Sequence, residues 1–328
     1  KADSETRRAA QTVIYKVLET LTAKQILKKF RVEYVATTDD PASPLSMHGM
    51  CGETNVRPTF RPDFALNMDA AALERLESAV GRKLDTLADL KKALEERLDY
   101  FISKGCKIAD HGMDYLPVPD VSENRAAKLY EKRETLDEHE REQLFSHLMY
   151  FMASLYTKNN IVMQLHFATF RNVNSTLARR IGRDSGFDIM RGHVDVDALV
   201  YFFDTLVQRN ALPKTVIYTL NPACVPAMAT LTGAFPNVRV GAAWWFNDTV
   251  EGIREQLKNV SEYAVLGTNL GMLTDSRSLA SYARFDFFRR ILADFVGGYV
   301  ERGEYDMNAA KHLMTAVCYG NVKAFLGL

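Results

Sequence analysis

Cysteine is scarce in this 328-residue sequence, and no two of the four cysteines form a CxxC pair. So few cysteines in a chain of this length do not make a disulfide framework, and we expect free thiols in a cytoplasmic protein. An excess of one charge is also lacking, because 41 basic residues balance 41 acidic ones and no long basic run occurs. We therefore expect no binding to nucleic acid or to a membrane. The cysteines are Cys51, Cys106, Cys224 and Cys318.

Long hydrophobic runs and the common nucleotide-binding motifs are absent as well. No apolar stretch reaches the roughly 20 residues that a membrane helix needs, and the opening KADSETRRAAQ does not read as a signal peptide. No Gly-x-Gly-x-x-Gly follows an expected strand and no P-loop occurs, which argues against a nucleotide-binding protein. HxH and HExxH pairs are lacking too, so the residues alone leave the question of a metal open.

Short runs typical of strands alternate with longer stretches that have helical spacing. Such alternation is typical of a parallel sheet of βα units, and the length and repetition favour a (β/α)8 TIM barrel over an open doubly wound sheet. We predict an α/β fold with one barrel domain over residues 1–328 and a helical excursion around 117–160. The expected strands are 31–40, 56–66, 107–114, 161–172, 214–222, 238–248 and 262–277. The expected helices include 71–80, 87–105, 133–158 and 285–305, with a capping box at Thr135 and Glu138 of the third.

The number of strands falls short of a closed barrel. We count seven strands in the sequence, whereas a barrel of this type has eight. A helical stretch begins almost at residue 1. We therefore interpret the seven as strands 2–8, and expect the first strand and an N-terminal helical part to precede residue 1.

Polar side chains gather near the ends of six expected strands, where a βα barrel builds its active site. Arginine suits a carboxylate or phosphate, and aspartate or histidine can ligate a metal, move a proton or bind sugar hydroxyls. Asp275 and Arg277 would share one face of the last strand, because they lie two residues apart. A small polyhydroxylated anion fits this mixture. The residues are Thr37, Thr38, Asp39, Asp40, Arg61, Asp63, Asp110, His111, His166, Arg171, Trp244, Trp245, Asn247, Asp248, Asp275 and Arg277.

Each of these residues also has a structural interpretation. Asp39 lies in an Asp-Asp-Pro sequence that fits a turn or a helix cap, and Arg61 can simply pair with Asp63. A single histidine in an apolar run, such as His166, is often a satisfied core residue, and one of the two adjacent tryptophans is expected in the core. The coincidence of so many polar strand ends favours a pocket, because a buried unpaired charge costs on the order of several kcal/mol.

The motifs TTDDP with a histidine at position 48, PTFRPD, DHGMD, QLHFATFRN, DSGFD, AAWWFND and GMLTDSRS occur in this order. In this combination the sequence resembles the uronate isomerases of the amidohydrolase superfamily, which are (β/α)8 barrels. The resemblance extends from about residue 31 to the end. It implies an aldose–ketose isomerisation: D-glucuronate to D-fructuronate, and D-galacturonate to D-tagaturonate. We favour an enediol route over a hydride shift.

The resemblance also implies roles for individual residues. Asp275 corresponds to the aspartate that contacts a divalent metal, usually zinc, and is the candidate catalytic group for proton transfer between C1 and C2. Arg61 corresponds to an arginine that holds the substrate carboxylate. The other implied substrate-binding residues are Asp110, His166, Trp244 and Arg277. The implied partner is the uronate itself, and a homo-oligomer is a further expectation.

The sequence departs from the family pattern at its beginning. The His-x-His pair of the family's first strand, which binds the metal, is not in these 328 residues, nor is the histidine and tyrosine pair that follows. We expect the remaining metal ligands upstream of residue 1, and expect residues 1–328 alone to be inactive. Two alternatives remain open: a hydrolase of the same superfamily with another substrate, and a truncated, non-catalytic protein that binds sugar acids.

Overall fold

A computed structural model describes residues 4–113, 116–182, 185–276 and 278–328. Its centre is a set of parallel strands that neighbour each other in chain order. β1 pairs with β3, and β4, β5, β8 and β9 form a second sheet. Phe60 joins the two sheets through parallel bridges to Asp39 and Ala109. The parallel strands are β1 (Tyr34–Ala36), β3 (Thr54–Arg57), β4 (Ile108–Gly112), β5 (Val162–Phe167), β8 (Thr215–Thr219) and β9 (Val238–Val240).

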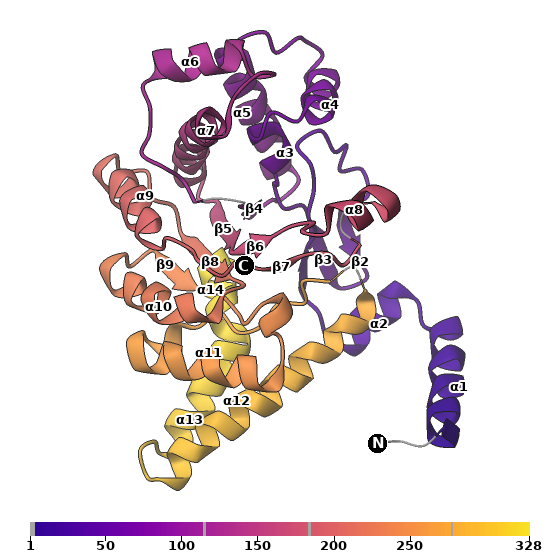
Figure 1. Cartoon of the computed structure of the whole chain (residues 1–328). Coiled ribbons are helices and arrows are strands. Elements are labelled where there is room, and N and C mark those ends of the chain that lie inside the picture. Colours follow the sequence, from indigo (N-terminus) through magenta and orange to yellow (C-terminus); the bar gives the residue numbers. More distant parts are fainter. Residues whose placement is uncertain (1–3, 114–115, 183–184, 277) are drawn as a thin grey trace.

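The central strands are largely buried because both faces of the sheet are covered. All five residues of β8, TVIYT, are buried, and four of the five residues of β4 are. Helices pack outside them, as expected for a parallel sheet made from βα crossovers. Figure 1 shows the strands between two groups of helices, α3–α7 on one side and α9–α12 on the other. The predicted α/β class and parallel sheet are therefore confirmed.

The helices and remaining strands complete the fold, and the first helix projects from the rest (Figure 1). The helices are α1 (Ser4–Thr20), α2 (Ala23–Lys29), α3 (Asp63–Leu66), α4 (Ala70–Val80), α5 (Leu87–Ser103), α6 (Glu123–Glu131), α7 (Glu138–Lys158), α8 (Ser175–Ile181), α9 (Asp197–Gln208), α10 (Val225–Ala234), α11 (Val250–Tyr263), α12 (Ala283–Glu301), α13 (Met307–Thr315) and α14 (Asn321–Leu326). The short strands are β2 (Gly49–Cys51), antiparallel to β3, and the hairpin β6 (Thr169–Phe170) with β7 (Ile189–Met190). No described helix is both long and apolar enough to cross a membrane.

The last predicted strand, 262–277, is wrong. Residues up to 263 end α11, and the described residues that follow form a 3-10 turn at Leu266–Thr268 and then irregular backbone. Gly271 has a φ of 75° and donates its N–H to the Asn269 side chain. A Cβ at Gly271 would meet Val317 O at 2.4 Å, so the loop passes close to the C-terminal helices. Such a positive φ is incompatible with an extended strand.

Two other expected elements are shorter or begin elsewhere. The strand expected at 238–248 ends at Val240; irregular backbone follows, and a 3-10 turn occupies Trp245–Asn247. The predicted capping box is also wrong. Asp137 caps α7 by accepting from Glu140 N, whereas the Thr135 hydroxyl donates to Lys132 O. Aspartate is as good an N-cap as threonine, and here it lies one residue before the first helical residue.

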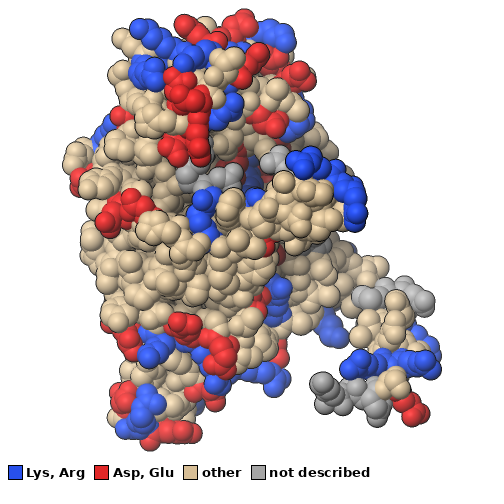
Figure 2. Space-filling view, in the orientation of Figure 1, with Lys and Arg blue, Asp and Glu red and all other residues tan. Residues whose placement is uncertain are grey.

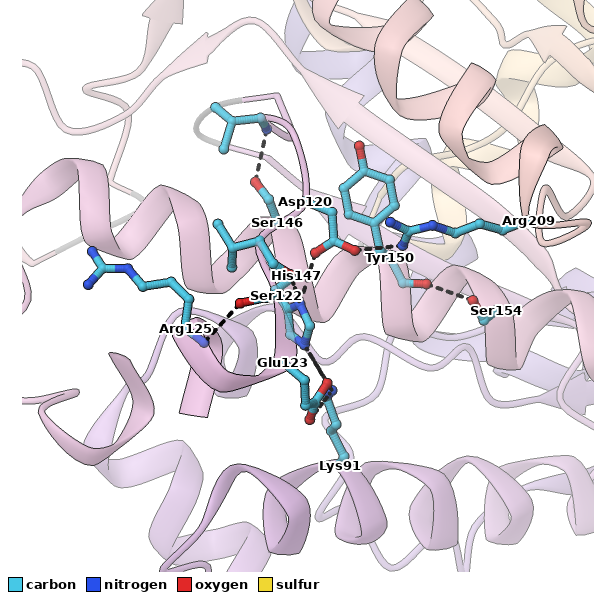
Figure 3. Close-up of polar contacts among 12 residues, drawn as sticks. Lys91, Asp120, Ser122, Glu123, Arg125, Ser146, His147, Tyr150, Ser154 and Arg209 are labelled. Carbon is cyan, nitrogen blue, oxygen red and sulfur yellow. Dashed lines mark hydrogen bonds and ion pairs between the residues drawn. The ribbon is translucent and has the colours of Figure 1, made fainter. Parts of the chain in front are cut away.

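A polar cluster ties the helical excursion around 117–160 together (Figure 3). His147 on α7 places Nδ1 2.8 Å from Asp120 and Nε2 3.1 Å from Glu123 on α6. Asp120 also pairs with Arg209, which follows α9, and Glu123 pairs with Lys91 on α5. The cluster therefore connects four helices on the side of the molecule where α5–α7 lie.

Candidate active site

The carboxyl ends of the parallel strands bring their polar residues together. In the register, Gly112 of β4 pairs with His166 of β5, and His166 pairs with Tyr218 of β8. Residues paired in this way project to the same face of the sheet. Asp110 lies on that face too, two residues before Gly112, whereas His111 points to the opposite face. One face at one edge thus holds an acid, a histidine and a tyrosine.

Arg61 lies between two buried carboxylates. Its Nε is 3.0 Å from Asp63 Oδ2, and its Nη1 is 3.0 Å from Asp110 Oδ2. Burial lowers the pKa of Arg61, but the charges of Asp110 and Asp63 outweigh it and raise that pKa. The side chain remains 33% exposed while both carboxylates are about 10% exposed. Arg61 is therefore a permanent cation whose outer edge reaches the surface of the site.

Gly112 makes room for this arginine. A Cβ built on Gly112 would lie 2.4 Å from Arg61 Nη2, closer than a real contact allows. The Gly112 N–H also donates to Asp63 Oδ2 at 2.7 Å. Among the described residues, Asp63 and Asp110 are the acceptors of Arg61, through Nε and Nη1. The Nη2 group, which passes over Gly112, remains for a ligand.

Asp110 and His166 are in direct contact next to Arg61. His166 Nδ1 lies 2.8 Å from Asp110 Oδ1. Burial raises the pKa of Asp110, but the charges of His166 and Arg61 outweigh it and lower that pKa to about 2. Asp110 is therefore ionised at neutral pH. Because it occupies Nδ1, the ring nitrogen of His166 that can meet a ligand is Nε2.

Two aromatic rings fix the plane of His166. The Tyr218 ring stacks on the imidazole at 4.3 Å with an interplanar angle of 1°, and the Trp244 ring meets it edge-on at 4.7 Å. Gly241 permits the position of Tyr218, since a Cβ there would lie 2.1 Å from Tyr218 Cε1. Burial raises the pKa of Tyr218, so its hydroxyl stays protonated.

Asp275 completes the cluster from the loop that follows α11. Trp244 donates its indole Nε1–H to Asp275 Oδ2. Asp275 has a φ of 39°, a left-handed conformation that Asp tolerates better than most residues. Nearby, Arg284 Nη1 contacts Asp248 Oδ2 at 2.8 Å and Thr274 O at 2.9 Å. Burial and the Asp275 charge raise the pKa of Asp248, and Arg284 opposes them.

The structure brings together five of the predicted site residues: Arg61, Asp110, His166, Trp244 and Asp275. Arg277 lies outside the described residues. Other candidates are engaged elsewhere. His111 bonds to Asp63 and to the Tyr156 hydroxyl inside the core, at 3.0 and 3.1 Å.

Sequence reasoning missed Tyr218. The strand at 214–222 was the one candidate without a charged residue at its end, and charge was the feature used to find the site. Its place near the carboxyl end of that strand was a usable signal, because a βα barrel builds its active site there. Asp63 was interpreted as a structural partner of Arg61, and the pair is present.

The described residues contribute little to a metal site. They hold no group of three or more His, Cys, Asp or Glu side chains that could bind a metal ion. Asp275 is a single carboxylate, and one of its oxygens already accepts from Trp244. The described part of the chain therefore does not form a metal site by itself.

Comparisons with known proteins agree with the cluster. The family described as glucuronate isomerase matches residues 6–326. A uronate isomerase from Caldanaerobacter subterraneus subsp. tengcongensis is 39% identical, over 94% of this chain and 71% of its own length. The solved uronate isomerase of Thermotoga maritima superimposes with a TM-score of 0.90 at 34% identity, covering 95% of this chain and 71% of that one.

A second solved structure, a glucuronate isomerase from Caulobacter crescentus, has a TM-score of 0.86 at 26% identity, with 93% and 66% of the two chains covered. The predicted amidohydrolase-type fold is thereby confirmed, and so is the resemblance read from the motifs. The chain belongs to the glucuronate isomerase family and is a uronate isomerase.

Proposed function

We propose that this isomerase interconverts D-glucuronate with D-fructuronate, and D-galacturonate with D-tagaturonate, by moving a proton between C1 and C2. The single observation that carries the proposal is the contact chain from Arg61 through Asp110, His166 and Trp244 to Asp275. It places a fixed cation at one end and a carboxylate at the other. A uronate presents a carboxylate at one end and the reacting carbons at the other.

Arg61 binds the substrate carboxylate in this proposal, with Arg277 as a second substrate contact. Arginine offers a planar set of donors that matches a carboxylate. With Nε and Nη1 held by Asp63 and Asp110, the guanidinium cannot rotate away. The carboxylate is therefore oriented before reaction, which reduces the entropy lost on reaching the transition state.

Asp275 acts as the base that takes the proton from one carbon and returns it to the other. The hydrogen bond from Trp244 fixes one carboxylate oxygen and leaves the other for the substrate. An enediol intermediate carries extra negative charge on oxygen, and a hydrogen-bond donor at that oxygen stabilises it. We propose that His166 Nε2 faces that oxygen, since Asp110 lies at Nδ1.

We further propose a divalent metal, zinc, with Asp275 among its ligands. When bound, such an ion would polarise the substrate oxygen. The described residues do not make the site alone, so any further ligands would have to come from outside them. The steps given above use the side chains of this chain. Metal analysis of the purified full-length product tests the proposal, with about one zinc per chain expected.

The remaining proposals concern the state of the protein. We propose one barrel domain, supported by a single large core that includes residues from Leu45 to Leu326. We propose a cytoplasmic enzyme, in keeping with four free cysteines. We propose a homo-oligomer that takes a small-molecule uronate and binds neither nucleic acid nor membrane. Light scattering after gel filtration measures the oligomeric state.

The assay of choice follows both uronates by NMR with the full-length product of the gene. The expected result is a ketouronic acid at equilibrium with each aldose form. If a folded and metal-loaded protein converted neither uronate, the proposed function would be overturned. Conversion of one alone would narrow the substrate class to that sugar.

A further inference from the structure

A second, basic groove lies beside the candidate active site, in the segment from β6 through α8 to β7. It is a cavity of about 600 Å³, lined by Phe170, Asn172 and the arginines Arg171, Arg179 and Arg191 among others. No carboxylate of the described residues lines it. Figure 2 shows basic side chains gathered over α8 at this place. The groove therefore has the charge to attract an anion.

Two residues that line this groove each have a buried polar atom without a partner among the described residues. Arg191 Nε, a donor, and Asn172 Oδ1, an acceptor, are both buried without a hydrogen bond. Each is held in place: the Arg191 guanidinium lies 4.8 Å from the Phe170 ring, and Asn172 N bonds to Asp188 Oδ1 at 2.8 Å. A buried unpaired polar group costs free energy, so such atoms call for a partner.

The two atoms require different hydrogen-bond partners. Arg191 needs an acceptor and prefers an anionic one, while Asn172 Oδ1 needs a donor such as a hydroxyl. Inorganic anions such as sulfate supply the first but not the second. A hydroxy acid supplies both, since it carries a carboxylate and hydroxyls within one small molecule. Sugar acids are therefore the ligand class that fits the groove.

A row of ring contacts connects this groove to the catalytic cluster. Arg171 lies 5.7 Å from the Trp245 ring, Trp245 contacts Trp244 at 5.7 Å, and Trp244 contacts His166 at 4.7 Å. Arg171 itself pairs with Asp188 at 3.1 Å. The groove thus adjoins the site where the same class of molecule reacts.

We propose that the groove of Asn172, Arg179 and Arg191 is an outer subsite that binds a sugar acid next to the catalytic cluster. The identity of the biological ligand rests on the proposed function. The ability of the groove to bind a sugar acid does not. The subsite raises the local concentration of uronate at the mouth of the active site. Its loss would raise KM and leave kcat unchanged, because the groove contains none of the groups proposed for the proton transfer.

The test uses R191Q and R179Q in the full-length protein, with R180Q as the matched control. Arg180 is an exposed residue of the same helix that does not line the groove. We expect KM for D-glucuronate to rise roughly two- to fivefold in each groove variant, with kcat unchanged and R180Q like wild type. Equal KM values in wild type and both groove variants would overturn the proposal. An equal rise in R180Q would overturn it too, since that indicates steering by net charge alone.

Direct binding separates this proposal from the catalytic one. D-glucarate has carboxylates and hydroxyls but no aldehyde, so it binds without reacting. Calorimetric titration is expected to find two D-glucarate sites per wild-type chain and one in R191Q, with R191K partly restoring the second. If sulfate displaces D-glucarate from the second site as well as D-glucuronate does, the groove recognises charge alone and the assignment to hydroxy acids is wrong. Should the wild type fail to isomerise uronates, this titration still tests the groove.

Discussion

The indole N–H of Trp244 donates to the carboxylate of Asp275, and this bond joins the segment after β9 to the loop after α11. It fixes a residue whose own backbone, at a φ of 39°, is held in the left-handed region. Backbone strain of this kind persists where the surroundings determine it, and it concentrates at functional sites. The geometry of Asp275 therefore depends on Trp244 as much as on its own loop.

Replacing Asp275 by asparagine removes the proposed base and keeps the shape of the side chain. We expect kcat for D-glucuronate to fall roughly a hundredfold or more, the usual contribution of a general base. D294N is the matched control, because Asp294 is an exposed carboxylate on α12 with 67% of its side chain accessible. Activity of D275N within about threefold of wild type would rule out the assigned role.

Adding a methyl group at Gly112 tests the position of Arg61. The new Cβ would lie 2.4 Å from Arg61 Nη2, so the guanidinium must shift. We expect G112A to raise KM roughly tenfold, more than it lowers kcat, because the change affects binding of the carboxylate. G297A is the control, since a Cβ at Gly297 on α12 meets nothing within 4 Å. An unchanged KM in G112A would show that Arg61 does not hold the substrate.

Gly241 tests the stacking of Tyr218 on His166. In G241A the Cβ would lie 2.1 Å from Tyr218 Cε1, which forces the ring or the strand end to move. We expect kcat/KM to fall roughly tenfold and the free energy of unfolding to drop by about 1–3 kcal/mol. G233A, in α10 with open space at the Cβ, should be neutral or stabilising. If G241A matched G233A in both measurements, the stacked ring would have no role.

Acid should weaken the fold through Asp110. Its pKa falls from the usual 3.8 to about 2 in the folded chain, so the folded state favours the ionised form. The stability from this group is present above about pH 4 and is lost as the pH falls towards 2; it amounts to on the order of 2 kcal/mol. Urea unfolding between pH 5 and pH 2.5 should show a shallower pH dependence for D110N than for wild type. Equal slopes would contradict the assignment.

The polar cluster of His147 should stabilise the fold without affecting catalysis. Asp120 contacts His147 at 2.8 Å and Arg209 at 2.5 Å. D120A removes the ion-pair partner of Arg209 and one acceptor of His147, which keeps its contacts with Glu123 and Val121 O. We expect the free energy of unfolding to fall by about 1–3 kcal/mol with KM unchanged. D99A, at an exposed position of α5, provides the comparison. A changed KM in D120A would contradict this prediction, because it would show that the helical excursion affects substrate binding.

Strand prediction from the sequence succeeded for the strands that lie buried in the main sheet. The runs at 161–172 and 214–222 are mostly apolar and contain several β-branched residues, and each holds a strand of the main sheet. The run at 107–114 holds a strand as well, although Ile108 is its one β-branched residue. It failed at 262–277, where the residues are apolar but the backbone turns at Gly271 and Asp275. These positive φ values depend on tertiary contacts that no local pattern contains: Trp244 contacts Asp275, and the C-terminal helices lie close to Gly271.

The site was predictable in its charged members and not in its neutral ones. Arg61, Asp110 and Asp275 were visible because charge is unusual at the end of an apolar run. The role of Tyr218 in the site could not be predicted, since a tyrosine in a buried strand is typical of a core. The positions of Gly112 and Gly241 could not be interpreted either, because each makes room for a side chain that is distant in the sequence.

The most direct test of the account is conversion of D-glucuronate by the full-length protein in D₂O, followed by NMR. We predict D-fructuronate, and D-glucuronate recovered at equilibrium with deuterium at C2, because a base on the protein exchanges its proton with solvent while the enediol forms. D275N should give neither product nor deuterium. A wild-type protein that neither converts D-glucuronate nor exchanges its C2 proton would contradict the central claim.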